Sequence, residues 1–147
     1  MRENDEAIEP EIALAAIGQP AIDPLLESLN ADDPAVRSRA ADALGRMGSR
    51  ARSAVERLMT LLDDTHRDPR ASAARALGQI GVHERRVIDA LGETLGDKFL
   101  DVRVAALEAL GEFGRSARPV RSRVAAMQFD RFQVVRRQAE RVLDLLK

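Results

Sequence analysis

The sequence repeats itself with a period of 33 residues, and this period restricts the chain to a small group of folds. Five columns keep the step: Arg37, Arg70, Arg103 and Arg136; Ala40, Ala73, Ala106 and Ala139; Leu44, Leu77, Leu110 and Leu143; Gly45, Gly78 and Gly111; and Gly48, Gly81 and Gly114. A repeat of this length is typical of stacked arrays, in which each unit covers the apolar face of its neighbour. The chain is therefore expected to form one repeat domain.

Each unit is predicted to hold two helices, which we call the first helix and the second helix. Asp33-Pro34 suits the start of a first helix, and Gly48 suits its left-handed end. Between them, apolar residues recur at helical spacing: Val36, Ala40, Ala43, Leu44 and Met47. We predict full units at 32–64, 65–97 and 98–130, a degenerate unit at 1–31 and half a unit at 131–147.

The two end units are expected to be incomplete. Ile12–Ile17 resembles the end of a first helix, and Ala21–Leu29 is predicted as its second helix, with Pro24 near the first turn. Val135–Leu146 is predicted as a last first helix without a second helix. End units of arrays are often atypical because one of their faces meets water.

Composition supports an all-α protein. Only 3% of the 147 residues are aromatic, so the core must be built from Ala, Leu, Val and Ile, a mixture that suits helices. The absence of Cys excludes disulfides and thiolate chemistry. We find no apolar run that could span a bilayer and no signal-peptide pattern, and therefore expect a soluble cytoplasmic protein without a membrane partner.

The arginine column is interpreted as structural. Asp64, Asp97 and Asp130 each precede the next arginine of the column by six residues. This pattern predicts a ladder of charge-assisted hydrogen bonds along the array rather than a phosphate site. The ladder comprises Arg37, Asp64, Arg70, Asp97, Arg103, Asp130 and Arg136. Because Ala31 stands where the first acid is expected, Asn30 or Asp32 would have to serve Arg37.

The glycine column inside the first helices indicates close helix packing. Each glycine costs about 1 kcal/mol of helix propensity relative to alanine, so its repetition at Gly45, Gly78 and Gly111 suggests that bare backbone is required there. The Gly-x-x-Gly pairs do not resemble phosphate-binding loops, because they follow a helical stripe and not a strand.

Charge is distributed unevenly although the formal net charge is −1. Residues 1–33 hold nine carboxylates and one arginine, whereas residues 115–147 hold nine cationic side chains and three carboxylates. Solvated helix faces are the ordinary explanation. End-to-end self-association and recognition of a dipolar partner are the alternatives.

The repeated motif resembles a known family. Asp33-Pro34-Ala35-Val36-Arg37, followed by Ala40-Ala41-Asp42-Ala43-Leu44-Gly45-Arg46-Met47-Gly48, is similar to the HEAT-like repeats of phycobilin lyase subunits. The resemblance extends from about Ile12 to the end of the chain. It implies an α-solenoid, a right-handed superhelix of antiparallel helix pairs, whose second helices line a concave face that binds a protein partner.

Under this resemblance, the partner-binding residues are the outward residues of the second helices. They are Asp23, Glu27, Arg52, Glu56, Arg57, Thr60, Arg85, Arg86, Asp89, Glu93, Arg118, Ser122 and Arg123. These positions differ between units, whereas the core columns repeat. Charges of both signs favour electrostatic recognition of a polar protein surface.

Enzymatic and nucleic-acid functions are the competing hypotheses. The di-iron site of HEAT-like deoxyhypusine hydroxylases needs several His-Glu pairs, but the chain has only His83-Glu84 and a lone His66. We therefore predict no catalytic residues, no metal and no cofactor. A lyase-type or accessory subunit stays an alternative, as does weak nucleic-acid binding by the basic C-terminal third. Nucleic-acid binding is disfavoured by the lack of Trp and Tyr and by the charge balance.

Overall fold

The computed structural model describes the chain from Gln19 to Lys147, and all its regular elements in this range are helical. The first helices are α4 (Pro34–Arg46), α6 (Arg67–Ile80), α8 (Leu100–Phe113) and α10 (Gln133–Leu145). The second helices are α3 (Gln19–Ser28), α5 (Val55–Leu61), α7 (Arg85–Thr94) and α9 (Arg121–Ala126). Short 3-10 segments η1 (Gly48–Ala54) and η2 (Gly114–Val120) lead into α5 and α9, and η3 (Met127–Phe129) follows α9.

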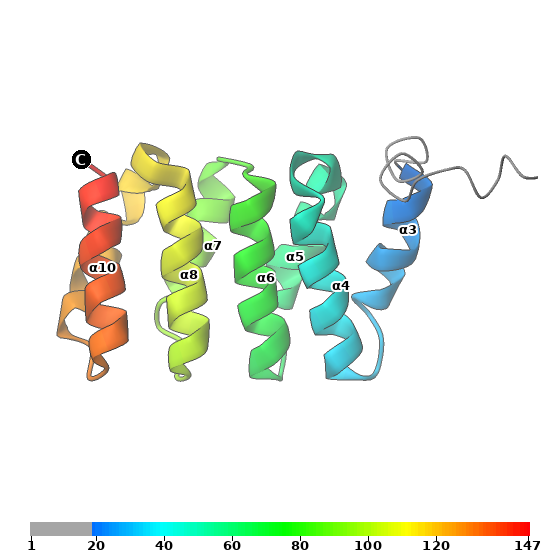
Figure 1. Ribbon diagram of the computed structural model, residues 1–147, viewed down its shortest axis with the longest axis horizontal. Helices are drawn as coiled ribbons and strands as arrows, with labels where there is room; N and C mark the ends of the chain where they lie inside the picture. Colours follow the sequence, from blue (N-terminus) through cyan, green and yellow to red (C-terminus); the bar gives the residue numbers. More distant parts are fainter. Residues whose placement is uncertain (1–18) are drawn as a thin grey trace, which may run out of the picture.

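The helices form two layers. In Figure 1 α4, α6, α8 and α10 stand side by side in front, α5 and α7 lie behind them, and α3 stands beside α4 at the end of the row. The predicted all-α solenoid is therefore confirmed. The segment expected at Ile12–Ile17 lies outside the described residues.

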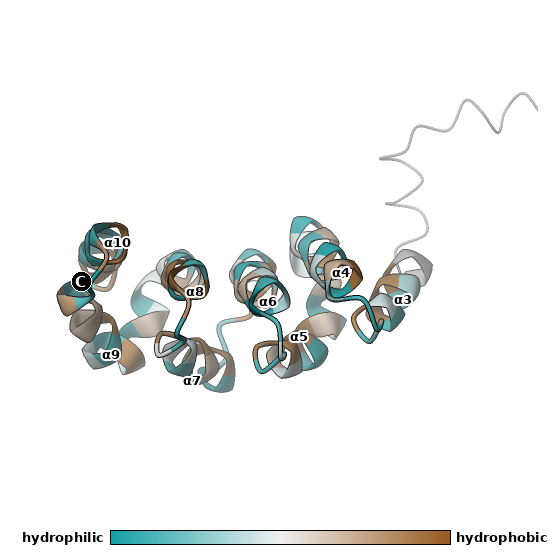
Figure 2. Ribbon diagram, turned by 90° about the horizontal axis from the view of Figure 1, so that it is seen from below, coloured by the Kyte–Doolittle hydropathy of each residue, from teal (hydrophilic) through white to brown (hydrophobic). Residues whose placement is uncertain are grey.

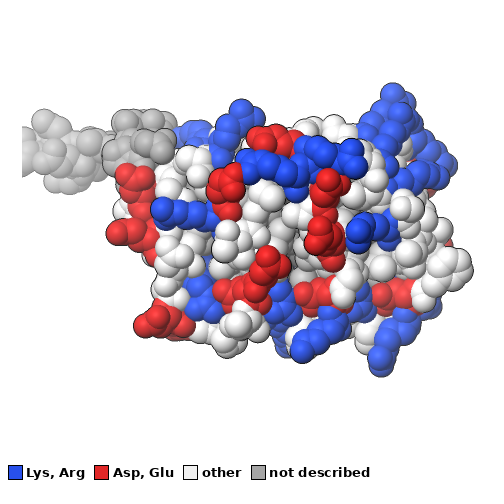
Figure 3. All heavy atoms as spheres, turned by 180° about the vertical axis from the view of Figure 1, so that it is seen from behind, with Lys and Arg blue, Asp and Glu red and all other residues white. Residues whose placement is uncertain are grey.

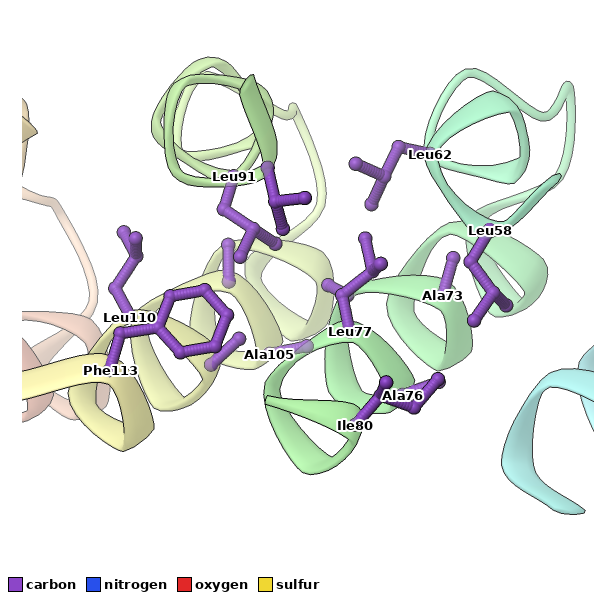
Figure 4. Close-up of a cluster of buried hydrophobic side chains, with 14 of the residues drawn as sticks. Leu58, Leu62, Ala73, Ala76, Leu77, Ile80, Leu91, Ala105, Leu110 and Phe113 are labelled. Atoms are coloured by element: carbon purple, nitrogen blue, oxygen red, sulfur yellow. The ribbon is translucent and has the colours of Figure 1, made fainter. Parts of the chain in front are cut away.

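The core fills the space between the two layers. Leu44, Leu77 and Leu110, from one sequence column, are at most 1% exposed. Figure 4 shows Leu77 of α6 pointing toward the space into which Leu62 of α5 and Leu91 of α7 also point. Complete burial of one such leucine contributes about 1.5–3 kcal/mol, so the repeated apolar columns supply most of the driving force for stacking.

Neighbouring first helices approach closely at two glycines. A Cβ atom at Gly78 would lie 2.7 Å from the Cα of Ala109, and one at Gly45 would lie 2.9 Å from the Cα of Ala76. The expected requirement for bare backbone therefore holds at these two positions. It is wrong for Gly111, where a Cβ would meet only Val142 Cγ2, at 3.4 Å, and Leu145 Cδ1, at 3.5 Å.

The reason for the difference lies in the helix opposite each glycine. The helices opposite Gly45 and Gly78 present alanine, whereas α10 presents Val142 opposite Gly111. The larger valine side chain holds α10 at a distance at which an added methyl group fits.

The array bends toward the layer of first helices. Figure 2 views the helices end-on, and both rows curve to the side on which α4, α6, α8 and α10 lie. The first helices thus line the concave side, and the expectation that the second helices would line it is wrong. The physical reason is the close packing of the first helices through Gly45 and Gly78, which has no counterpart between α5 and α7.

Helix ends follow the sequence in part. Gly48, Gly81 and Gly114 have positive φ values of 61°, 78° and 54°, which favour glycine. The left-handed cap is confirmed at Gly81, whereas Gly114, with ψ of −131°, has positive φ but lies outside the left-handed helical region. Pro24, however, is the sixth residue of α3, because this helix begins at Gln19 and not at Ala21. Burial of Ile22 and Leu29 holds the helix together around the proline.

Candidate functional site

Three arginine–aspartate pairs run along one edge of the second-helix side. Nε and Nη2 of Arg37 donate to the two carboxylate oxygens of Asp64 at 2.8 and 2.9 Å. Arg70 donates in the same way to Asp97 at 2.7 and 3.2 Å. Arg103 donates to Asp130 at 2.8 and 3.2 Å. Figure 3 shows the alternation of blue and red along the lower edge of this face.

Each of these arginines also donates a hydrogen bond to a main-chain carbonyl oxygen. Nη1 donates to the carbonyl oxygen six residues earlier, namely that of Ala31 for Arg37, of Asp64 for Arg70 and of Asp97 for Arg103. Every guanidinium thereby joins its own unit to the end of the preceding one. Arg136 keeps only the carbonyl of Asp130 in the described part of the chain.

The structure corrects the partners in this ladder. The acid six residues before each arginine offers its carbonyl, and its carboxylate pairs with the arginine 27 residues earlier. Asp32 does serve Arg37, as one of the two expected residues, but through its carbonyl oxygen, which accepts a hydrogen bond from Nη1 at 3.0 Å. The carboxylate that pairs with Arg37 is that of Asp64, which was not expected. The physical reason is that each second helix runs back to the start of its own first helix.

The carboxylates of the ladder accept further hydrogen bonds from main chain. The N–H groups of His66, Phe99 and Phe132 donate to Asp64, Asp97 and Asp130 at 2.9, 3.0 and 2.9 Å. Burial alone would raise the pKa of Asp64 and Asp97, but the hydrogen bonds from the arginine and from this N–H lower it below the ordinary value of 3.8. The same bonds lower the pKa of Asp130. The carboxylates of Asp64, Asp97 and Asp130 are thus each held by an arginine and by a main-chain N–H group, which supports a structural role for these three pairs.

This pKa depression predicts acid sensitivity. A carboxylate with a folded-state pKa below its unfolded value stabilises the fold above the unfolded value, and this contribution is lost as the pH falls through the folded-state pKa. We expect the melting temperature to be constant near neutral pH and to fall below about pH 4. Changing Asp64, Asp97 and Asp130 to Asn should lower stability at pH 7 and flatten the acid limb in circular dichroism melts. Asp23→Asn with Glu27→Gln is the control, and an equal flattening there would contradict the assignment.

The predicted partner-binding residues lie on the second-helix side, on α3, α5, α7, α9, η1 and η2. All are exposed except Asp89, which is half-buried. Several of them pair with one another: Arg86 binds Glu56 across two units, and Arg85 binds Asp89 at 2.9 Å within α7. Figure 3 shows the resulting mixture of both signs over this face.

Arg118 has a different role from the one expected. Its Nε donates to the carbonyl oxygen of Leu146 at 2.7 Å, and its Nη2 binds that of Lys147. The side chain thus satisfies carbonyl groups at the end of α10. Arg118 therefore joins η2 to the last helix.

Two grooves cross the second-helix side. One, of about 720 Å³, lies between α5 and α7, and the predicted residues Arg86, Asp89 and Glu93 line it. The other, of about 770 Å³, lies between α3 and α5 and contains the predicted Arg57 and Thr60. The remaining predicted residues lie outside both grooves.

Sequence reasoning missed the floor of the α5–α7 groove, which Met59, Leu62 and Ala90 form. These residues have the spacing of core positions, and they reach a groove because α5 and α7 stand apart. Asp63 lines both grooves and so lies at the ridge between them. Asp63 shares one column with Gly96 and Phe129, so the residue at this position differs from unit to unit, as expected for an outward residue of the second helices.

The described residues offer neither a candidate metal site nor a helix that could span a membrane. Between Gln19 and Lys147 there is no group of three or more His, Asp or Glu side chains that could hold a metal ion. None of the helices described is long and apolar enough to cross a bilayer. His83 lies in the loop before α7, where its ring is 4.8 Å from that of Phe113 and Nδ1 is 3.1 Å from Ser116 Oγ.

The fold and the grooved polar face define an α-solenoid, an array whose broad surface is formed by side chains of consecutive units. A family model for HEAT repeats matches residues 12–78 and 55–144. The chain belongs to the HEAT repeat family. A comparison with curated proteins finds no match.

Several solved structures share the fold. An engineered protein matches with a TM-score of 0.75 and 25% identity, covering 95% of this chain and 69% of its own. A designed armadillo repeat protein in complex with the peptide (KR)4 matches with a TM-score of 0.73 and 19% identity over 89% of this chain and 66% of that one, which supports the fold alone. The complex of CpcE and CpcF of phycocyanin lyase from Nostoc sp. PCC7120 matches with a TM-score of 0.67 and 26% identity. That match covers 83% of this chain, which spans 52% of the matched one.

Proposed function

We propose that this protein is a non-catalytic scaffold that binds a protein partner on its second-helix face. The observation that carries the proposal is the pair of adjacent grooves, each with a different lining on an otherwise repeated frame. The core columns repeat from unit to unit, whereas the residues on this face differ between units. Grooves with apolar floors and charged rims suit a polypeptide, which brings both apolar and ionic groups.

Charge placement supports recognition of a polar segment. Asp63 and Glu93 make no ion pair within residues 19–147, whereas Arg86 is held by Glu56 and Glu84. Carboxylates that need no rearrangement to meet a ligand are available at the ridge and in the α5–α7 groove.

A photo-crosslinking experiment tests the proposal. A benzophenone amino acid placed at Thr60 or at Glu93 reports on one groove each, and the same group at Gln79 or Glu112 on the exposed side of the first helices is the control. We expect a discrete protein adduct from the groove positions in a lysate of the source organism, and none from the controls. Adducts from the control positions alone, or to nucleic acid, would contradict the proposal.

A second candidate is an accessory subunit of a lyase-type complex. The similarity to the CpcE–CpcF complex favours it, since two different chains, CpcE and CpcF, form a complex there. This hypothesis predicts that one discrete protein, a second subunit, is crosslinked in stoichiometric amount. A coloured tetrapyrrole retained during purification would favour it further.

A further inference from the structure

A second surface lies at the edge where the first helices begin. A cleft of about 490 Å³ opens at the N-terminal ends of α8 and α10, next to the rings of Phe99 and Phe132. Three cationic groups lie over these rings: that of Arg67 is 4.9 Å and that of Lys98 is 5.4 Å from the centroid of Phe99, and that of Arg131 is 5.0 Å from the centroid of Phe132. We call this surface the aromatic cleft.

The aromatic cleft interrupts a repeated pattern. The residue at the start of each first helix is Asp33, His66, Phe99 and Phe132 in turn, and the residue before it is Asp32, Thr65, Lys98 and Arg131. The edge therefore changes from acidic at α4 to cationic and aromatic at α8 and α10. Asp33 accepts a hydrogen bond from the N–H of Ala35, whereas Phe99 and Phe132 provide no side-chain cap. Asp101 in the first turn of α8 accepts a hydrogen bond from the N–H of Val102, whereas the first turn of α10 has no carboxylate. The dipole of α10 thus adds to the positive potential of the two cations.

The cations of the aromatic cleft are available to a partner. Lys98 and Arg131 are exposed, and neither forms an ion pair within residues 19–147. Arg67 lies 3.9 Å from the carboxylates of both Asp68 and Asp101, distances at the limit of an ion pair. Asp101 also lines the cleft. Because its carboxylate repels other anions, the cleft is less suited to a long polyanion than to a short acidic segment.

Exposed apolar side chains are frequent near the start of α10, where Phe132 lines the aromatic cleft. The large hydrophobic residues that are exposed in the described part of the chain are Phe129, Phe132, Val134 and Leu145. Three of these four fall within residues 129–134, at the start of α10, and Phe129 is 88% exposed. A surface that combines apolar groups with flanking cations matches a segment that has an apolar residue between carboxylates.

We propose that the aromatic cleft binds residues 1–11 of a second copy of this chain. This segment carries five carboxylates and one arginine, and its Ile8 stands two residues after Glu6 and directly before Glu9. In the sequence this segment precedes α3, and α3 lies at the opposite end of the array from α10 (Figure 1). Binding of this segment to the cleft of another copy would therefore connect the α3 end of one array to the α10 end of the next, which is head-to-tail association.

Charge reversal in the full-length chain tests this inference. We expect sedimentation velocity to show concentration-dependent association at low salt, weakened at high salt because the contact is ionic and exposed. Lys98→Glu with Arg131→Glu should weaken association by at least about tenfold, and Glu6→Lys with Glu9→Lys should have the same effect. The chain that carries all four changes should associate again, because the charges are then exchanged.

Controls separate this outcome from misfolding and from the proposed function. Arg46→Glu with Arg50→Glu makes the same charge change elsewhere on the exposed surface and should leave association unchanged, and circular dichroism checks that each variant is folded. A wild-type chain that stays monomeric at every concentration would overturn the inference. So would association that survives both reversals, or a fourfold variant that fails to associate. The groove residues are untouched, so partner crosslinking at Thr60 and Glu93 is expected to persist in every variant.

Discussion

Arg103→Ala is expected to lower the free energy of unfolding by about 3 kcal/mol, because it leaves the carboxylate of Asp130 buried without its ionic partner. The side chains of Arg103 and Asp130 are only 10% and 8% exposed. The same change removes the hydrogen bond to the carbonyl of Asp97, which joins two units. Urea unfolding followed by circular dichroism measures the loss.

Arg136→Ala is the matched control, because Arg136 belongs to the same column but binds only the carbonyl of Asp130 in the described chain. Its expected cost is about 1 kcal/mol, the typical contribution of one hydrogen bond. Equal losses for the two variants would show that the carboxylate pairing contributes little. Arg103→Ala should also leave the set of crosslinked partners unchanged, since Arg103 lines neither groove on the second-helix side.

Gly78→Ala is expected to destabilise the fold by about 2 kcal/mol although alanine is the better helix former. The new methyl group would lie 2.7 Å from the Cα and 2.9 Å from the Cβ of Ala109, so α6 and α8 would have to separate. Backbone atoms cannot move aside as the end of a flexible side chain can. Thermal and urea unfolding both report the change.

Gly111→Ala should have the opposite sign. Its new methyl group would make ordinary contacts with Val142 and Leu145, so the gain in helix propensity, about 1 kcal/mol at most, is not cancelled by a clash. The pair of variants therefore separates close helix packing from intrinsic helix propensity. Destabilisation of similar size in both variants would contradict the packing explanation.

Much of the core could be predicted from the period. Leu44, Leu77 and Leu110 were placed together by their spacing, and all three are buried. The reason is that a stacked repeat puts each column in the same environment. For the glycine column, the prediction of close helix packing fails at Gly111 because the environment changes there. The facing helix α10 presents Val142 instead of alanine.

The ladder shows where linear spacing misleads. Asp64 is close in sequence to Arg70, and its carbonyl does bind that arginine. Its carboxylate, however, turns to Arg37, across a whole helix pair. Because sequence distance cannot say which of two arginines a side chain faces, the residues of the ladder were identified but their partners were not.

The surface was the least predictable part. The thirteen proposed partner-binding residues do lie on the second-helix side, but Arg118 binds the end of α10. The grooves and the aromatic cleft arise from gaps between neighbouring helices. A gap depends on the sum of many side-chain volumes and has no motif of its own.

By itself the sequence determined the helical type of the units, the residues of their core and the glycines with positive φ at the ends of the first helices, because these depend on local conformation and on a periodic apolar pattern. Only the tertiary structure decided the bend of the array, the pairing of each aspartate with an arginine 27 residues earlier and the position of the grooves. These features depend on how far one helix stands from the next. That distance is set jointly by residues of both helices, as at Gly78 and Ala109.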